Sequence, residues 1–144
     1  MNVIVNSDVW SEAFRRGSSK SVYVEELYEL ISETRIELLG AIRQEILSGI
    51  RSAKVFERID RSLSVFDNRL IETEVYSVAA KFFNLCRSKG IQGSNTDFLI
   101  CSCAVSWGYP ILTKDQDFFH YQKLIPIELL APRNSLSNNN FDRV

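Results

Sequence analysis

Acidic and amide side chains follow two short apolar segments of this sequence, 3–5 and 109–113. If both segments are strands of one parallel sheet, their carboxyl ends meet at one edge, which is where such folds bind ligands. A local explanation stands beside this one, because Ser, Asn and Asp cap helices and acids suit a first helical turn. The residues concerned are Asn6, Ser7, Asp8, Asp115 and Asp117.

Glu45 lies inside an apolar helical pattern. Ile42, Ile46 and Gly49 surround it at i, i+3, i+4 and i+7 spacing, which predicts that Glu45 faces the core. A carboxylate in that position needs a metal ion or a basic partner, because an unpaired buried charge is costly. The alternative is that Glu45 lies at the edge of the apolar stripe and bonds Arg43 or a neighbouring basic group.

Asp97 has a similar ambiguity. It shares a helix face with the apolar segment 100–104, yet Ser94 stands at the spacing of a helix cap. Acids on separate elements that converge at one sheet edge repel one another unless a cation holds them together. Oxygen ligands of this kind select Mg²⁺ or Mn²⁺ over zinc, which prefers Cys and His.

Other kinds of site find no support in the sequence. The three cysteines, Cys86, Cys101 and Cys103, have no CxxC spacing, and we expect buried free thiols. The single histidine, His120, is expected at the surface. There is no GxGxxG, no P-loop, and no Ser/His/Asp or Cys/His set.

Apolar segments alternate with stretches of helical periodicity, which is typical of βα units around a parallel sheet. Gly90 and Gly108 are expected to follow helix ends. Strands are predicted at 3–5, 35–39, 109–113 and 127–130, with a brief one at 69–71. Helices are predicted around Val9–Phe14 and at 22–31, 41–50, 52–63, 72–89, 97–107 and 115–121.

Composition indicates one ordinary globular domain. The 144 residues are 45% hydrophobic and 24% charged, with a net charge of -1. We expect a single domain over 1–132 and a polar, disordered tail over 133–144. No run approaches the roughly 18 apolar residues of a membrane span, and no basic leader follows Met1, so a soluble, cytoplasmic protein is expected.

A nucleic-acid partner would need a local basic patch, since the net charge supplies no global field. One candidate is the segment 51–63, whose basic residues follow helical spacing and are candidate RNA contacts. A merely solvated helix face is the alternative. The basic residues are Arg51, Lys54, Arg58 and Arg61, and the residues expected to face the core are Val55, Phe56, Ile59 and Leu63.

From residue 3 to 130 the chain resembles the PIN-domain ribonucleases, and among them the VapC-type toxins of bacterial toxin–antitoxin pairs. The third and fourth motifs in tandem, separated by Gly108, are the more specific part. The resemblance rests on Val3-Ile4-Val5-Asn6-Ser7-Asp8-Val9-Trp10, on Glu45-Ile46-Leu47-Ser48-Gly49, on Asp97-Phe98-Leu99-Ile100-Cys101-Ser102-Cys103-Ala104, and on Ile111-Leu112-Thr113-Lys114-Asp115-Gln116-Asp117-Phe118.

This resemblance implies a three-layer α/β/α domain with a central parallel sheet, and an endoribonuclease dependent on Mg²⁺ or Mn²⁺. It implies an RNA substrate such as tRNA, an antitoxin partner, and a homodimer or toxin–antitoxin hetero-oligomer. Separately, Val22 and Tyr23 are apolar residues of the segment 21–31 that are candidate contacts for a second copy or an antitoxin, with ordinary core packing as the alternative. The implied catalytic residues are Asn6, Glu45, Asp97 and Asp115. The implied metal ligands are Asn6, Asp97, Asp115 and Asp117, supported by Ser7, Asp8 and Thr113.

Position 6 departs from the family, which has its first catalytic Asp where this chain has Asn6. Asn loses one negative charge, so a weaker divalent-cation site is expected. Three hypotheses follow: an exchange made to disarm a toxin, a naturally inactive binding member, or compensation by Asp8.

Two alternative functions accompany the ribonuclease prediction. One is an inactive PIN-like module that binds RNA or an antitoxin. The other is a haloacid-dehalogenase-type phosphatase, in which the segment 3–8 is a strand followed by DxD whose nucleophile has become Asn. The phosphatase alternative leaves Glu45 unexplained and lacks a late Gly-Asp-Gly motif.

Overall fold

β1 (Val3–Val5) lies at the centre of a parallel sheet, in a computed structural model that describes residues 1–15 and 20–133. Among these residues the strand order is β2-β1-β3, with β2 at Ile36–Glu37 and β3 at Ile111–Leu112. Ile4 of β1 pairs with Glu37 on one side and with Ile111 on the other. The predicted parallel sheet is confirmed, although β2 and β3 are shorter than expected.

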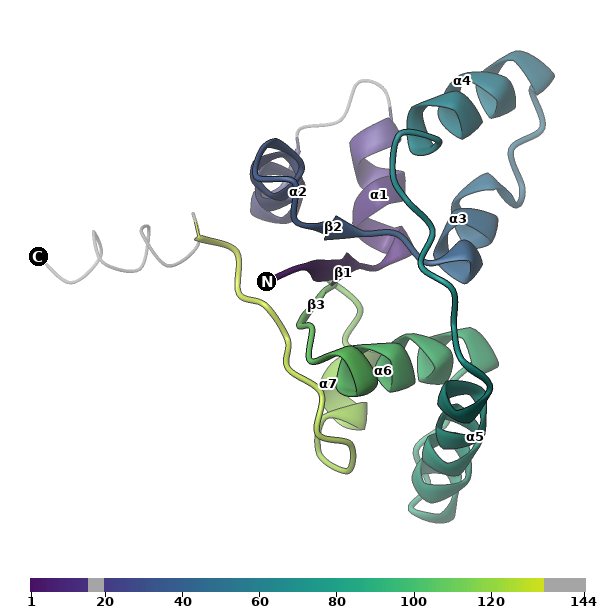
Figure 1. The fold of residues 1–144 in the computed structure, drawn as a ribbon, viewed down its shortest axis with the longest axis vertical. Coiled ribbons are helices and arrows are strands. Elements are labelled where there is room, and N and C mark those ends of the chain that lie inside the picture. The colour runs from purple at the N-terminus through teal and green to yellow at the C-terminus, as the bar shows by residue number, and fades with distance from the viewer. Residues whose placement is uncertain (16–19, 134–144) are drawn as a thin grey trace, which may run out of the picture.

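Helices cover both faces of this sheet (Figure 1). α1 (Ser7–Phe14) and α2 (Val22–Ser32) lie on one face, and α6 (Asn95–Trp107) and α7 (Asp117–Tyr121) lie on the opposite face. α3 (Gly40–Leu47) packs beside α1, α4 (Ala53–Leu63) beside α3, and α5 (Thr73–Ser88) beside α6. The arrangement is the expected three-layer α/β/α domain.

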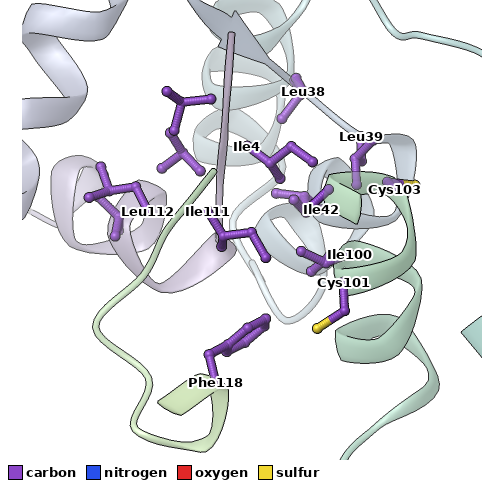
Figure 2. Packing of buried hydrophobic residues seen from close by; sticks show 14 of the residues in the cluster. Ile4, Leu38, Leu39, Ile42, Ile100, Cys101, Cys103, Ile111, Leu112 and Phe118 are labelled. Carbon is purple, nitrogen blue, oxygen red and sulfur yellow. The ribbon is translucent and has the colours of Figure 1, made fainter. Parts of the chain in front are cut away.

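β1 and β3 are apolar throughout because both of their faces are buried, whereas β2 is half-buried and carries Glu37. Every side chain of β1 and β3 is fully buried, as is typical of parallel strands between two helical layers. Figure 2 shows Ile111 directed toward Ile100 and Phe118, with Leu112 on the other side of the strand. The three cysteines are buried free thiols, and His120 is exposed, as predicted.

The brief strand predicted at 69–71 is wrong. Leu70 is 87% exposed, so this segment has no buried apolar face to pair into the sheet. The Arg69 guanidinium instead lies 4.1 Å from the ring centroid of Trp107 and donates a hydrogen bond to the Tyr109 hydroxyl at 3.2 Å. The segment is therefore a connection between α4 and α5 that is pinned to the end of α6.

The strand predicted at 127–130 is reduced to one parallel bridge between Ile111 and Leu129. Its backbone still contributes, because the Leu130 N–H donates to the Ile111 carbonyl oxygen at 2.8 Å. Arg133, the last described residue, bonds to Glu26 and Glu33 of the α2 region. The remainder of the predicted tail lies outside the described residues.

Local chemistry sets the helix ends. Gly90 and Gly108 follow α5 and α6 with φ of +78° and +71°, as predicted. α3 ends earlier than expected, at Leu47, because Gly49 adopts φ +86°. α7 starts at Asp117 and not at 115, since the Asp115 carboxylate accepts from the Asp117 N–H.

α4 differs from its prediction in two respects. The Ser52 hydroxyl caps the helix by accepting from the Val55 N–H, so Arg51 precedes the helix and is not part of it. Phe56 is 38% exposed and not in the core, because α4 lies at the periphery and buries only its Ile59 and Leu63 side. None of the described helices is both long and apolar enough to cross a membrane.

Candidate metal centre

Three carboxylates converge where β3 and the first turn of α6 meet. Asp97, Asp115 and Asp117 each place one carboxylate oxygen within 4.8 Å of the others. Asp97 is also the residue whose N–H is capped by the Ser94 hydroxyl, at 3.1 Å. The predicted cap by Ser94 is confirmed, and the Asp97 carboxylate also lies in the acid cluster.

Thr113 connects this cluster to the end of β1. Its hydroxyl oxygen accepts from the Asp115 N–H at 3.1 Å and from the Asn6 side-chain amide at 3.2 Å. The same hydroxyl donates its single proton to the Asp8 carboxylate, at 3.2 Å. With one proton given and two lone pairs used, Thr113 fixes which end of the Asn6 amide faces it.

This orientation leaves the Asn6 carbonyl oxygen without a partner among the described residues, although Asn6 is only 5% exposed. Asn6 stands at the N-cap position of α1, but its side chain does not cap the helix. A buried polar atom without a hydrogen bond is costly, and such exceptions call for a specific cause. A cation or its water at this edge of the sheet would satisfy the Asn6 oxygen.

Asp8 is held by backbone and side-chain donors and is not a helix cap. The Lys114 N–H donates to its carboxylate at 2.7 Å, in addition to the bond from Thr113. Burial raises the pKa of Asp8, the nearby Asp115 raises it further, and these donors offset part of the rise. The Lys114 ammonium pairs with the buried Glu12 of α1 at 3.3 Å.

Glu45 does not lie on the core face of α3, and this expectation is wrong. Ile42 and Ile46 are buried, whereas Glu45 is exposed at the edge of their stripe, where the Ser7 hydroxyl donates to it at 3.5 Å. The alternative partner, Arg43, pairs with Asp60 of α4 instead.

The pKa values of Glu45 and Asp97 are raised in part because other acids lie close to them. Partial burial raises the pKa of Glu45, and the charges of Asp97 and Asp8 raise it further. Burial likewise raises the pKa of Asp97, with added repulsion from Asp115 and Asp117. Neighbouring carboxylates therefore disfavour the charged forms of Glu45 and Asp97.

The donor set fits a divalent cation of the Mg²⁺ or Mn²⁺ class. Carboxylate and amide oxygens are the ligands such ions prefer, and soft cysteine ligands are buried elsewhere in the core. Asn6, Asp97, Asp115 and Asp117 are the residues that would hold the ion. Thr113 hydrogen-bonds to Asn6 and Asp115 of this set, whereas Asp8 bonds to Thr113 and Ser7 bonds to Glu45.

One residue of this site was not identified from the sequence. Tyr121 is fully buried, and its hydroxyl donates to Asp97 Oδ2 at 2.7 Å. The available signal was weak: Tyr121 follows Asp117 by four residues, which places both on one side of a helix. Nothing in the spacing connects Tyr121 to Asp97, which is 24 positions earlier on another element.

The basic residues predicted to contact RNA form a separate feature. Lys54, Arg58 and Arg61 are exposed on α4 and, with Phe14 of α1, line a groove of about 800 Å³. Arg51 does not line this groove. Val22 and Tyr23, the candidate partner contacts of α2, are half-buried, and Tyr23 packs against the core.

No protein-family model matches this sequence, and no curated protein sequence is significantly similar to it. Solved structures do match. VapBC2 from Rickettsia felis, bound to a promoter DNA fragment, has a chain that is 18% identical with a TM-score of 0.71, covering 91% of this chain and 98% of the other. DNA-bound VapBC from Salmonella typhimurium gives 14% identity, a TM-score of 0.71, and coverage of 90% and 97%.

FitAcB from Neisseria gonorrhoeae matches with 16% identity and a TM-score of 0.70, covering 90% of this chain and 97% of the other. The TM-scores and coverages show a shared fold over nearly the whole of both chains, and at such low sequence identities they show the fold alone. The fold is the PIN-like α/β/α domain.

Proposed function

We propose that this protein is an endoribonuclease that depends on Mg²⁺ or Mn²⁺. The observation that carries the proposal is the convergence of three carboxylates, linked through Thr113 to a buried Asn6 whose carbonyl oxygen has no partner among the described residues. Clustered carboxylates of this kind repel one another unless a cation offsets their charge. The motif resemblance to PIN-domain ribonucleases favours RNA over other phosphodiesters as the substrate.

The residues have separate tasks in this proposal. Asp97, Asp115 and Asp117 bind the cation, and Asn6 contributes a neutral oxygen. Glu45, whose pKa is raised by partial burial and by Asp97, accepts the proton of the attacking water. A bound divalent cation lowers the pKa of that water and offsets the charge that develops on the phosphate.

Asn6 makes this a weaker cation site than one with Asp at the same position. Compensation by Asp8 as a direct ligand is disfavoured, because Thr113 and the Lys114 N–H already use its carboxylate. Whether the exchange is natural or was made to disarm a toxin, the expected result is the same loss of one negative charge.

We further propose that the protein is the toxin of a toxin–antitoxin pair, since its structural neighbours include chains of VapBC2 and FitAcB. The groove between α1 and α4 is the proposed antitoxin face. It combines basic side chains with an adjoining apolar hollow, which suits an acidic, amphipathic partner segment. The residues are Lys54, Arg58 and Arg61 on the basic side, and Trp10, Phe14, Tyr28, Val65 and Phe66 on the apolar side. We also propose that the protein can form a homodimer, and this proposal rests on the family resemblance alone.

The second candidate function is an inactive PIN-like module that binds RNA or an antitoxin without cutting, and Asn6 is the observation that favours it. The phosphatase alternative has little support, because its nucleophile position holds Asn6 and the fold is PIN-like.

The test is cleavage of total tRNA by the purified chain with Mn²⁺, with and without a chelator. The native sequence, Asn6→Asp and the double variant Asn6→Asp with Asp97→Ala are compared. We expect Asn6→Asp to cut RNA at least about tenfold faster than the native sequence, because the added charge strengthens cation binding. The double variant removes a ligand and is expected to be inactive.

Chelator must abolish the cleavage, which distinguishes the proposed activity from a contaminating metal-independent ribonuclease. If neither the native sequence nor Asn6→Asp cuts tRNA while both bind Mn²⁺ and remain folded, the binding-module alternative replaces the enzyme.

A further inference from the structure

The Tyr121 hydroxyl hydrogen-bonds to one acid of the cluster, Asp97. Its side chain is fully buried, and the hydrogen bond recorded for its hydroxyl is the one to Asp97 Oδ2, at 2.7 Å. A buried phenol needs a partner, and a bond to an ionised carboxylate is stronger than one to a neutral acceptor. The contact also joins α7 to α6, and so connects the segment that carries Asp115 and Asp117 to Asp97.

The ring of Tyr121 is packed between two aromatic rings and the backbone at Gly93. Its centroid lies 4.8 Å from that of Phe98 and 5.2 Å from that of Phe118. A Cβ at Gly93 would lie 2.2 Å from the Tyr121 hydroxyl oxygen and 2.9 Å from the Phe98 ring. Gly93 is not among the glycines with positive φ, so the space for Tyr121 is what requires glycine there.

This arrangement limits how Asp97 can bind a cation. With Oδ2 engaged by Tyr121, the carboxylate offers mainly its Oδ1. Mg²⁺ and Mn²⁺ take six ligands in octahedral geometry, and Mg²⁺ usually keeps several waters among them, whereas Ca²⁺ takes six to eight oxygens in flexible geometry and often uses both oxygens of a carboxylate. A carboxylate restricted to one oxygen therefore favours the smaller ions.

We propose that Tyr121 is a positioning residue that holds Asp97 as a one-oxygen ligand and thereby makes the site prefer Mg²⁺ or Mn²⁺ to Ca²⁺. This inference rests on the proposed cation site and adds to it a determinant of which cation binds. Tyr121 acts through Asp97 and contacts neither substrate nor water of the reaction.

The experiment is calorimetric titration of the purified chain with Mn²⁺ and with Ca²⁺, for the native sequence, Tyr121→Phe and Gly93→Ala. Tyr121→Phe keeps the ring and removes the hydroxyl, whereas Gly93→Ala keeps the hydroxyl and displaces it. We expect both variants to bind Mn²⁺ about 10- to 100-fold more weakly, the usual effect of losing a residue that orients a ligand. Ca²⁺ affinity is expected to change by less than about threefold, because Asp97 regains its second oxygen.

Tyr109→Phe is the matched control. Its hydroxyl accepts from Arg69 and has no bond to an acid of the cluster, so its loss should leave both affinities unchanged. Equal weakening of Mn²⁺ and Ca²⁺ binding in folded Tyr121→Phe would overturn the inference and reduce Tyr121 to a packing role. If the native chain binds Mn²⁺ and Tyr121→Phe binds it equally well, this inference alone fails. If the native chain binds no Mn²⁺, the proposed cation site fails first, and the selectivity inference fails with it.

Discussion

The Asn6 side chain could either cap α1 or hydrogen-bond to Thr113, and it bonds to Thr113. As an N-cap, Asn6 would accept from the first turn of α1, yet its amide nitrogen donates to Thr113 and its oxygen stays unpaired. The missing cap in the first turn of α1 and the buried unpaired oxygen therefore both lower the stability of the folded state at this position. A residue that gives up local stability in this way is the kind expected at a binding site.

The exchange Asn6→Asp tests this interpretation through stability. Thr113 has one proton, which it gives to Asp8, so a carboxylate at position 6 would face an oxygen that cannot also donate to it. In chelator, we expect the free energy of unfolding to fall by about 1–3 kcal/mol. Saturating Mn²⁺ should remove this deficit. Urea unfolding at neutral pH measures both values.

Asn2→Asp is the control for this prediction. The Asn2 side-chain amide donates to Glu37 Oε2 at 3.1 Å, as the Asn6 amide donates to the Thr113 hydroxyl, but Asn2 stands at the opposite end of β1. Its exchange should reduce stability without creating a deficit that Mn²⁺ repairs. Equal rescue of both variants by Mn²⁺ would contradict the assignment of Asn6 to the cation site.

At the scale of an element, α6 both supports the fold and presents a ligand. Ser94 and Ser52 cap α6 and α4 in the same way, each accepting from the N–H three residues on. Ser94→Ala and Ser52→Ala are each expected to lower the free energy of unfolding by about 1 kcal/mol. Ser94→Ala should also weaken Mn²⁺ binding several-fold, because the capped residue is Asp97 itself, whereas Ser52→Ala should not. Chemical denaturation and Mn²⁺ titration of both variants check this, and equal Mn²⁺ affinities would refute it.

The elements that could be predicted from the sequence are those whose signal is local. β1 and α6 are apolar on nearly all sides because they are buried between layers, and Gly108 ends α6 through its own backbone preference. The segment 69–71 was misassigned because its apolar residues look like a strand, whereas Arg69 stacks on Trp107 of another element. That contact has no periodicity to detect.

The candidate site shows the same division. Strand ends and motif spacing singled out Asn6, Asp97, Asp115 and Asp117, and the structure brings the carboxylates of the three Asp residues together. The exposure of Glu45 depends on how α3 is rotated against the sheet, and this rotation is set by packing and not by the spacing of α3. The bond between Tyr121 and Asp97 joins separate elements across a space that Gly93 leaves open, which becomes visible only in three dimensions.

On the scale of the whole molecule, a net charge of -1 conceals a strong local imbalance. Acids gather at the carboxyl edge of the sheet, while the groove on α4 is lined by three basic side chains, Lys54, Arg58 and Arg61, and one acid, Glu57. The groove beside α1 is therefore suited to acidic ligands, and the acid cluster is suited to cations. A partner segment on the groove and an ion in the cluster would each reduce the repulsion within one group of like charges.

The acid cluster makes folding depend on pH in a direction that can be derived. The pKa values of Asp8, Glu45 and Asp97 are raised, mainly by burial, so the folded state holds their protons more tightly than the unfolded state. Their contribution to the free energy of unfolding therefore falls as pH rises above about 4, where the unfolded carboxyls ionise. Glu12 acts in the opposite sense: burial raises the pKa of its carboxyl, but Ser21 and Lys114 together lower it below its ordinary value.

Asp97→Asn isolates the contribution of the cluster from that of Glu12. In chelator, we expect the variant to become more stable than the native chain as pH rises from 4 to 7, by roughly 0.5–1 kcal/mol because water screens this partly open site. With Mn²⁺ at about 100 times its dissociation constant, the native chain should gain about 2.7 kcal/mol at pH 7 and much less at pH 4, whereas the variant should gain little. Urea unfolding across this pH range, with and without Mn²⁺, gives all of these values. A native chain that gains stability over Asp97→Asn as pH rises in chelator would show that Asp97 is stabilised in its charged form by the protein alone, and the case for a cation at this edge of the sheet would lose its electrostatic basis.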